Sequence, residues 1–247
     1  MTKGYSSKFR LILKEKINPR ILKGSVLITG FRGFGLVGYL AIKHLRDKLN
    51  PKLIAYIISD RMTNIVYMSE GKLALPHEIY YYTNDNIKIL LLLNNALPPT
   101  ALSLPFARFT LKLAKRAGVQ ECIFIGGLNK SFNIEGDDSR FLVNSYHTKP
   151  VPGKVLENEL PVAGPLASMI IYSEILKIPS LTILPYTDPM RPDPRAAAIA
   201  VEKINKLLNI SVDVTDLYEG ERVIQEELKN LMEYYKELEK GRGMHYM

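Results

Sequence analysis

The fold is decided at residues 25–38, which read SVLITGFRGFGLVG. The first five residues of this stretch are apolar and β-prone, which predicts a buried strand. A turn rich in glycine follows at 30–35, and the apolar spacing from Leu36 to Asp47 then fits an amphipathic helix. The stretch therefore predicts a strand, a glycine turn and a helix, which is the start of an α/β unit.

The same alternation continues outward from this unit. Strands are expected at 53–59, 87–93, 121–125, 140–145 and 180–184, and helices at 104–117, 164–176 and 194–208. Gly118 is expected to end the first of these helices, while Asp193 caps the last one with Pro194 at its first position. Two short apolar segments, 65–68 and 78–83, are expected to form an irregular hairpin. Strands that alternate with helices imply an α/β fold with a three-layer, mostly parallel or mixed sheet.

The composition describes a soluble globular protein. The chain has 247 residues, of which 47% are hydrophobic and 23% charged, and it carries a formal charge of +8. Its longest aliphatic run, Ile89 to Leu93, is too short to cross a bilayer, and its first eight residues do not resemble a signal peptide. Cys122, the one cysteine, lies in an apolar run, which favours a buried thiol in a reducing compartment. A cytoplasmic location without a membrane partner is expected.

The positive charge is concentrated at the front of the chain. Residues 1–60 hold 12 lysines and arginines against 3 acidic residues, a net charge of +9. These basic residues are scattered singly among apolar ones, without an arginine cluster or a recognisable nucleic-acid module. The pattern suits an acidic partner, and it does not favour binding to nucleic acid.

The last part of the chain differs from the rest. From 216 to 240, apolar residues at heptad spacing alternate with glutamate and lysine, which predicts a long helix with a seam for a partner surface. Two interpretations stay open: packing against its own domain, and self-association. Glycines at 241 and 243 are expected to end the helix. The expected layout is a single α/β domain over 1–215, a heptad-patterned helix over 216–240 and a flexible tail over 241–247.

The glycine turn allows three interpretations. Residues 33–38 match G-x-G-x-x-G, and with Asp60 at the end of the next strand they would suit a dinucleotide. A second interpretation is a phosphate site of the nucleoside phosphorylase class, formed by Gly30, Arg32, Gly33, Gly35 and Arg61. The third, and the favoured one, is close packing of the helix on the sheet, because Phe31 and Phe34 are bulky where a phosphate would need access.

The remaining chemistry-bearing residues predict no catalytic site. The four histidines, His44, His77, His147 and His245, have no metal-ligand spacing and are interpreted as surface or loop residues. A Gly-x-Ser-x-Gly elbow is absent. The adjacent acids at 137–138 fit no calcium loop and are interpreted as a solvated loop. No metal, cofactor or enzyme activity is expected.

Four motifs carry a resemblance to a known family. They are GFRGFGLVG at 30–38, IFIGGL at 123–128, VAGPL at 162–166 and DPRAA at 193–197. In this order and spacing the chain resembles, over residues 8–240, archaeal members of the proteasome assembly chaperone family related to the second eukaryotic assembly chaperone. The resemblance implies a phosphorylase-like α/β fold and a homo-oligomer, to which the heptad pattern adds a long C-terminal helix. It also implies binding to proteasome α-subunits or the α-ring without ATP.

The family resemblance also directs attention to the C-terminus. Proteasome-binding proteins often end in a hydrophobic residue, a tyrosine and any residue, and this chain ends in His245, Tyr246 and Met247. Tyr246 has the expected place, whereas His245 stands where a hydrophobic residue is usual. These three residues are the expected partner-binding residues, and an oligomer would present several tails at once.

Overall fold

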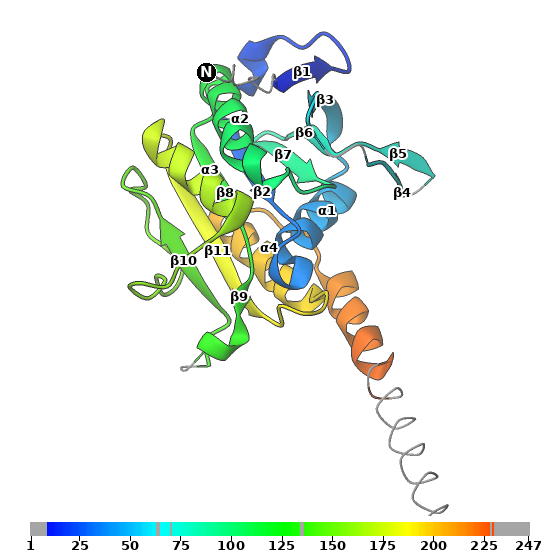
Figure 1. Ribbon diagram of the computed structural model, residues 1–247, viewed down its shortest axis with the longest axis vertical. Coiled ribbons are helices and arrows are strands. Elements are labelled where there is room, and N and C mark those ends of the chain that lie inside the picture. The colour runs from blue at the N-terminus through cyan, green and yellow to red at the C-terminus, as the bar shows by residue number, and fades with distance from the viewer. Residues whose placement is uncertain (1–8, 63–64, 70, 134–135, 228, 230–247) are drawn as a thin grey trace, which may run out of the picture.

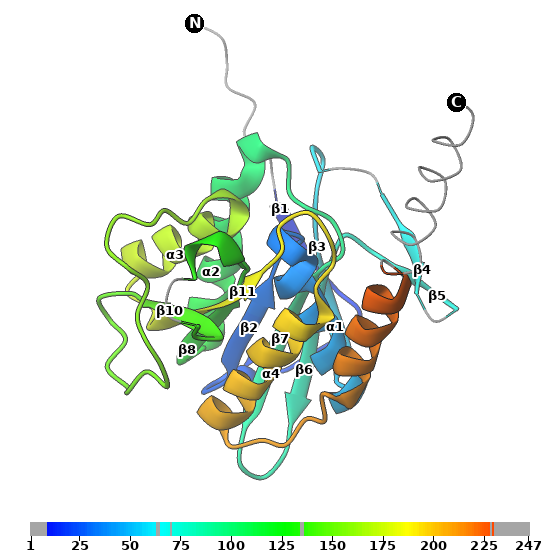
Figure 2. The same cartoon turned by 90° about the horizontal axis from the view of Figure 1, so that it is seen from below.

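A computed structural model describes residues 9–62, 65–69, 71–133, 136–227 and 229. Over these residues a large mixed sheet carries helices on both faces (Figures 1 and 2), so the predicted three-layer α/β fold is confirmed. Among the helices described, none is long and apolar enough to cross a membrane.

The nine-stranded sheet has the order β1-β3-β6-β7-β2-β8-β11-β10, with β9 beside β11, and the short strands β4 and β5 pair separately. The strands are β1 (Phe9–Leu13), β2 (Val26–Gly30), β3 (Lys52–Ser59), β4 (Tyr67–Ser69), β5 (Lys72–Ala74), β6 (His77–Thr83), β7 (Lys88–Asn94), β8 (Glu121–Ile125), β9 (Leu128–Asn129), β10 (Ser139–Val143) and β11 (Ser180–Thr187). The helices are α1 (Val37–Leu49), α2 (Ser103–Ala117), α3 (Gly164–Ile175) and α4 (Pro194–Leu208), followed by a helix over 215–227.

The centre of the sheet is parallel and its borders are antiparallel. β7, β2, β8 and β11 run in one direction, while β6 and β10 pair in the opposite direction at either side. β2 lies between β7 and β8 and is buried at every position. A strand covered on both faces is expected to be uniformly apolar, which is why the run at 25–29 marks the centre of the fold.

Two hydrophobic cores lie on opposite faces of the sheet. Val26 and Ile28 of β2 join the core under α1 and α4, while Leu27 joins the core under α2 and α3. This alternation follows from the two-residue period of a strand. Cys122 is buried in the second core, as predicted.

The hairpin predicted from 65–68 and 78–83 is wrong. β4 instead pairs with β5, and β6 pairs with β7 on one side and β3 on the other. The physical reason is burial. The segment His77–Thr83 buries more apolar surface within the large sheet than it would in an isolated two-stranded hairpin. The β4–β5 arm extends from the body in Figure 1.

Strand β11 is longer than predicted. The sequence placed its end at Pro185, but β11 runs to Thr187. The pairing of β11 with β8 ends at Ile183. Pro185, which has no backbone N–H to donate, therefore lies beyond the residues that pair with β8. The strand then pairs with β9, which brings Thr187 to the end of the sheet.

The predicted helix boundaries agree closely with the structure. Gly118 ends α2 with φ of 74°, and the side chain of Asp193 caps α4 by accepting a hydrogen bond from the amide of Ala196. Pro194 occupies the first turn of α4. These ends are local features of the chain, so local sequence predicts them well.

Candidate functional site

The parallel strands β7, β2, β8 and β11 end at one side of the sheet, here called the carboxyl edge. The segments that follow them, 95–99, 31–36, 126–127 and 188–193, meet there. Ligands of open α/β sheets bind in the crevice outside this edge. The carboxyl edge is therefore where a phosphate or nucleotide site would have to form.

The helix that follows the glycine turn packs tightly against the backbone at this edge. A Cβ on Gly38 would lie 2.5 Å from the carbonyl oxygen of Ile125 and 2.8 Å from the amide nitrogen of Phe31. A Cβ on Gly30 would lie 2.5 Å from the Cα of Gly38. Helix α1 thus rests directly on the ends of β2 and β8, and this close approach requires glycine at both positions.

The loops of the carboxyl edge are also bound to one another. Gly35 has φ of 60°, and a Cβ there would overlap the side chain of Thr187. The Thr187 hydroxyl donates to the carboxylate of Asp193 over 2.7 Å, and the amide of Asp193 donates to the carbonyl of Gly35 over 2.8 Å. A Cβ on Gly127 would lie 2.6 Å from the Phe34 carbonyl oxygen. Gly30, Gly35, Gly38 and Gly127 thus lie in close packing contacts, whereas a Cβ on Gly33 would meet nothing within 4 Å.

The two arginines of the phosphate hypothesis follow strands that are three positions apart. Arg32 follows β2, while Asp60 and Arg61 follow β3, and β6 and β7 lie between. At about 4.8 Å per strand this places the strand ends roughly 14 Å apart. The Arg32 guanidinium lies 3.9 Å from the ring centroid of Tyr39, and Asp60 pairs with Arg10 over 2.5 Å. The phosphate and dinucleotide hypotheses stay predictions. In the structure, however, Arg32 contacts Tyr39 and Asp60 pairs with Arg10.

Exposed apolar side chains occur in the segments that follow the strands. Phe34, Leu97, Phe132 and Met190 come from four different loops at the carboxyl edge, and their exposed fractions range from 43% for Leu97 to 89% for Met190. Large apolar groups gathered at one edge of a sheet are a common feature of protein docking surfaces. These side chains give part of the carboxyl edge the character of a contact surface. Beside them, Thr187, Asp188 and Asp193 line a pocket of about 400 Å³ whose walls are mostly polar and charged.

The surface or loop interpretation of the histidines is wrong for His44 and His77. His44 is buried on α1, where its Nε2 lies 2.7 Å from the carbonyl oxygen of Asp213. His77 is 1% exposed in β6, with its Nδ1 2.7 Å from the side-chain oxygen of Asn94. Burial lowers the pKa of His77 to about 4, so the ring is neutral near pH 7. His147 does lie in a loop, and His245 lies outside the described residues.

A buried polar network was missed by the sequence analysis. Glu78 is 3% exposed, and its carboxylate accepts hydrogen bonds from the backbone amide of Leu75, the hydroxyl of Tyr80 and the side chain of Asn95. Burial raises the pKa of Tyr80, and the nearby Glu78 charge raises it further. The available signals were a glutamate inside an apolar strand and the Asn94–Asn95 pair at the end of another.

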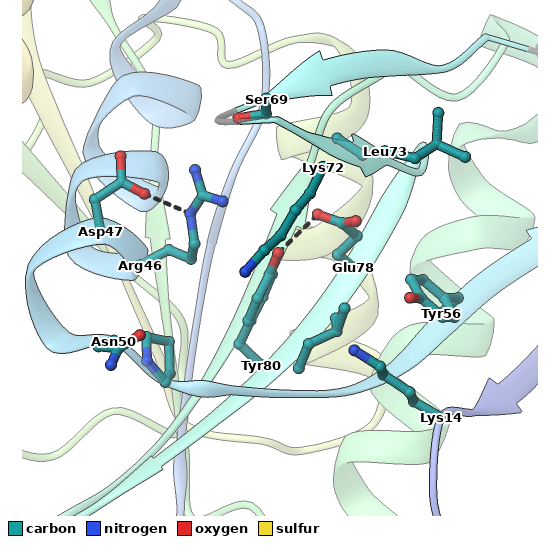
Figure 3. Close-up of a pocket in the computed structure, with 13 residues that line it drawn as sticks. Lys14, Arg46, Asp47, Asn50, Tyr56, Ser69, Lys72, Leu73, Glu78 and Tyr80 are labelled. Carbon is teal, nitrogen blue, oxygen red and sulfur yellow. Dashed lines mark hydrogen bonds and ion pairs between the residues drawn. The ribbon is translucent and has the colours of Figure 1, made fainter.

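This network forms part of the wall of a 560 Å³ pocket, shown in Figure 3. Arg46 and Asp47 of α1, Lys72 of β5 and Lys14 also line it, so the pocket presents both signs of charge. The three donors to Glu78 satisfy much of the hydrogen-bonding capacity of that buried carboxylate. The network therefore has a structural role: it ties the start of β6 to the segment after β7.

Charged side chains near β10 form ion pairs with one another. Arg140 is almost fully buried and pairs with Asp137 and Glu157, while Asp138 pairs with Lys203. The hydrogen bond from Lys154 lowers the pKa of Asp137, and that from Arg140 adds to this effect. In the described part of the chain, no cluster of three or more histidine, cysteine, aspartate or glutamate side chains is placed to hold a metal ion.

The expected partner-binding residues His245, Tyr246 and Met247 lie outside the described residues, as do most heptad positions of 216–240. The described part of that helix begins against the body. Leu217 is buried, and Arg191 makes two hydrogen bonds to the carboxylate of Glu221, at 2.8 and 3.2 Å.

Known proteins resemble this chain over nearly its whole length. Residues 27–232 match the PAC2 family. An uncharacterized protein of Methanocaldococcus jannaschii is 24% identical over 233 residues, which are 92% of each chain. Two solved structures of Pyrococcus furiosus proteins superpose well. PbaA, described as an archaeal homolog of proteasome-assembly chaperone, has a TM-score of 0.77 at 24% identity, covering 96% of this chain and 97% of PbaA. PbaB, described as an archaeal proteasome activator, has a TM-score of 0.76 at 20% identity, covering 91% of this chain and 99% of PbaB.

Proposed function

The chain belongs to the PAC2 family, and on this premise we propose that it is a non-enzymatic proteasome assembly chaperone or proteasome-binding factor. It recognises α-subunits of the 20S proteasome or the α-ring, partly through its C-terminal tail and without ATP. The observation that carries this proposal is the family match over residues 27–232, which agrees with the resemblance found in the four sequence motifs. The names of the two Pyrococcus furiosus proteins support a proteasome-related role.

The carboxyl edge supports a role in docking. Its glycine turn holds Gly30, Gly38 and Ile125 in close backbone contact, so the turn ties helix α1 to the ends of β2 and β8. Exposed Phe34 and Met190 at the same edge offer apolar surface to a partner. A rigid body with exposed apolar surface suits a protein that positions another polypeptide.

The tail supplies the second contact. The ring of Tyr246 inserts into an apolar pocket of the partner, and the terminal carboxylate of Met247 pairs with a lysine there. The heptad-patterned helix over 216–240 brings copies of the chain together, so several tails act at once. Avidity then makes a modest affinity of each tail sufficient.

The test is a pull-down of α-subunits from lysate with the full chain. Tyr246→Ala, or deletion of Tyr246 and Met247, weakens capture of the α-ring at least tenfold while thermal stability and oligomer size stay unchanged. Tyr246→Phe is the matched control, since it keeps the ring and retains binding. Full capture by Tyr246→Ala would show that the tail is dispensable, and no capture by the unmodified chain would reject the function.

A second candidate function is a nucleoside phosphorylase-like enzyme that holds phosphate near Gly30, Arg32, Gly33, Gly35 and Arg61. One observation favours it: the Nε of Arg32 is buried without a hydrogen-bond partner among the described residues. This candidate predicts that millimolar phosphate raises the melting temperature and that Arg32→Ala abolishes the rise. The absence of a rise in the unmodified chain would exclude it.

A further inference from the structure

An apolar hollow of about 380 Å³ lies between α2 and the part of the sheet formed by β3, β6 and β7. We call it the α2 hollow. Of the 17 residues that line it, only Thr110 and Arg116 carry polar side-chain atoms. Its volume falls in the range of about 300–1,000 Å³ typical of small-molecule sites, which combine apolar walls with a few polar groups.

The hollow exists because this face of the sheet lacks a full helical cover. α2 and α3 pack side by side, and α3 lies toward β8 and β11. Over β3, β6 and β7 the cover is α2 together with the irregular segment 14–24, which reaches the sheet through Ile17, Pro19 and Leu22. In this segment apolar residues alternate with charged ones, so it covers the apolar surface of the sheet and of α2 only in part. Filling the hollow with an alkyl group is favourable.

The chain segment that covers one side of the hollow is basic. The segment 14–23 carries Lys14, Lys16, Arg20 and Lys23, and its single acid, Glu15, pairs with Lys52. Lys23 lies against the end of α2, since a Cβ on Gly118 would be 3.1 Å from its Cγ. The stem of the Lys23 side chain therefore lies beside the C-terminal end of α2, whose last turn carries Arg116.

Several of these cations have room for a ligand. Within the described residues, Lys16, Arg20, Lys23 and Arg116 form no ion pair with a carboxylate. Arg116 lines the hollow directly. Arg116 thus places a positive charge at an apolar cavity, and an anion with an apolar body complements both features.

We propose that the α2 hollow binds a single-chain anionic amphiphile of the fatty-acid class. The alkyl chain fills the hollow between α2 and the sheet, and the carboxylate pairs with Arg116, whose planar guanidinium suits two parallel hydrogen bonds. Lys23 adds to the positive potential at the head group. This activity is separate from the proposed docking to proteasome subunits and does not depend on it.

The N-terminal residues are not the favoured occupant. Residues 1–8 join β1 at Phe9, whose ring packs against Phe106 and Phe109 at 5.9 and 5.7 Å between centroids. Arg116 lies at least seven residues further along α2, about 10 Å away along the helix axis. Phe9, the first residue that the structure describes, therefore lies away from the end of α2 that carries Arg116.

The experiment measures binding of dodecanoate to the purified full chain by titration calorimetry, with the melting temperature as a second readout. One saturable site and a rise in melting temperature are expected. Arg116→Gln should weaken binding about tenfold, since it removes a charge-assisted contact. Arg108→Gln, an exposed arginine of the same helix outside the hollow, is the matched control and should leave affinity unchanged.

Two filling variants test the location. Ala117→Phe occupies the hollow from α2 and should abolish binding. Leu13→Phe occupies it from the half-exposed edge strand β1, where a larger side chain is tolerated, and provides the same test if the first variant unfolds. Each variant is used only if its circular dichroism spectrum matches that of the unmodified chain.

Three results would overturn the proposal. One is the lack of saturable binding by both dodecanoate and hexadecanoate. Another is unchanged affinity in a folded filling variant, which would place the ligand elsewhere. The third is equal affinity for dodecanol and dodecanoate with no effect of Arg116→Gln, which would remove the role of the carboxylate.

Discussion

Replacing Gly38 by alanine is the sharpest test of the close packing of α1 on the strand ends. The added Cβ would lie 2.5 Å from the carbonyl oxygen of Ile125, 2.8 Å from the amide nitrogen of Phe31 and 3.0 Å from the Cα of Gly30. All three are backbone atoms, so no flexible side chain can move aside. Either α1 or the ends of β2 and β8 must shift.

The expected loss of stability follows from two opposing effects. Overpacking of a tight interior costs about 1–3 kcal/mol, and contact with backbone places this site at the upper end. Helix propensity opposes it, because alanine is favoured over glycine in a helix by up to about 1 kcal/mol. The net loss is about 2 kcal/mol, which for a chain of this size lowers the melting temperature by roughly 4–8 °C.

Gly220→Ala is the matched control. Gly220 also lies in a helix, over 215–227, but its added Cβ would meet Pro194 at 3.8 Å, an ordinary van der Waals distance. This variant should be more stable than the unmodified chain by up to about 1 kcal/mol. Chemical and thermal denaturation followed by circular dichroism measure both variants. A Gly38→Ala protein as stable as Gly220→Ala would refute the close packing, and with it the structural interpretation of the turn.

Two further predictions concern buried polar groups. Because burial lowers the pKa of His77 to about 4 from an ordinary 6.5, the unfolded chain takes up a proton that the folded protein does not. The free energy of unfolding should therefore fall by up to about 3 kcal/mol as the pH drops from 6.5 to 4. Denaturation of His77→Gln should lack this dependence on pH. An equal dependence in both proteins would contradict the lowered pKa of His77. Asp193→Ala removes the cap of α4 and the acceptor of the Thr187 hydroxyl, so melting should show a loss of about 2 kcal/mol, whereas Asp193→Asn keeps the cap and should lose less. Equal losses in the two variants would argue against capping.

Local signals predicted much of the fold. The apolar run before Gly30 identified the central strand, Gly118 identified the end of α2, and Asp193 with Pro194 identified the start of α4. Each of these features depends on residues within one or two turns of each other. The order of four short motifs also identified the family, which the match over 27–232 confirms.

Features that depend on residues distant in the sequence could not be predicted. β1 was not predicted at all, because Phe9–Leu13 is an edge strand whose partner, β3, lies more than forty residues later. The burial of His77 and Glu78 depends on Asn94 and Asn95 at the end of the neighbouring strand. A polar residue in a strand shows its burial only when its hydrogen-bond partners are known.

The chain's own order of residues determined the alternation of strands and helices, the family and the uneven charge, since all three are properties of short stretches or simple composition. Tertiary structure alone decided which strands are neighbours, how closely α1 packs on the strand ends, and which distant segments line the apolar α2 hollow. These depend on contacts between segments tens of residues apart, such as Gly38 with Ile125 and Lys23 with the end of α2. Such contacts depend on how whole layers pack together, and no local pattern encodes that geometry.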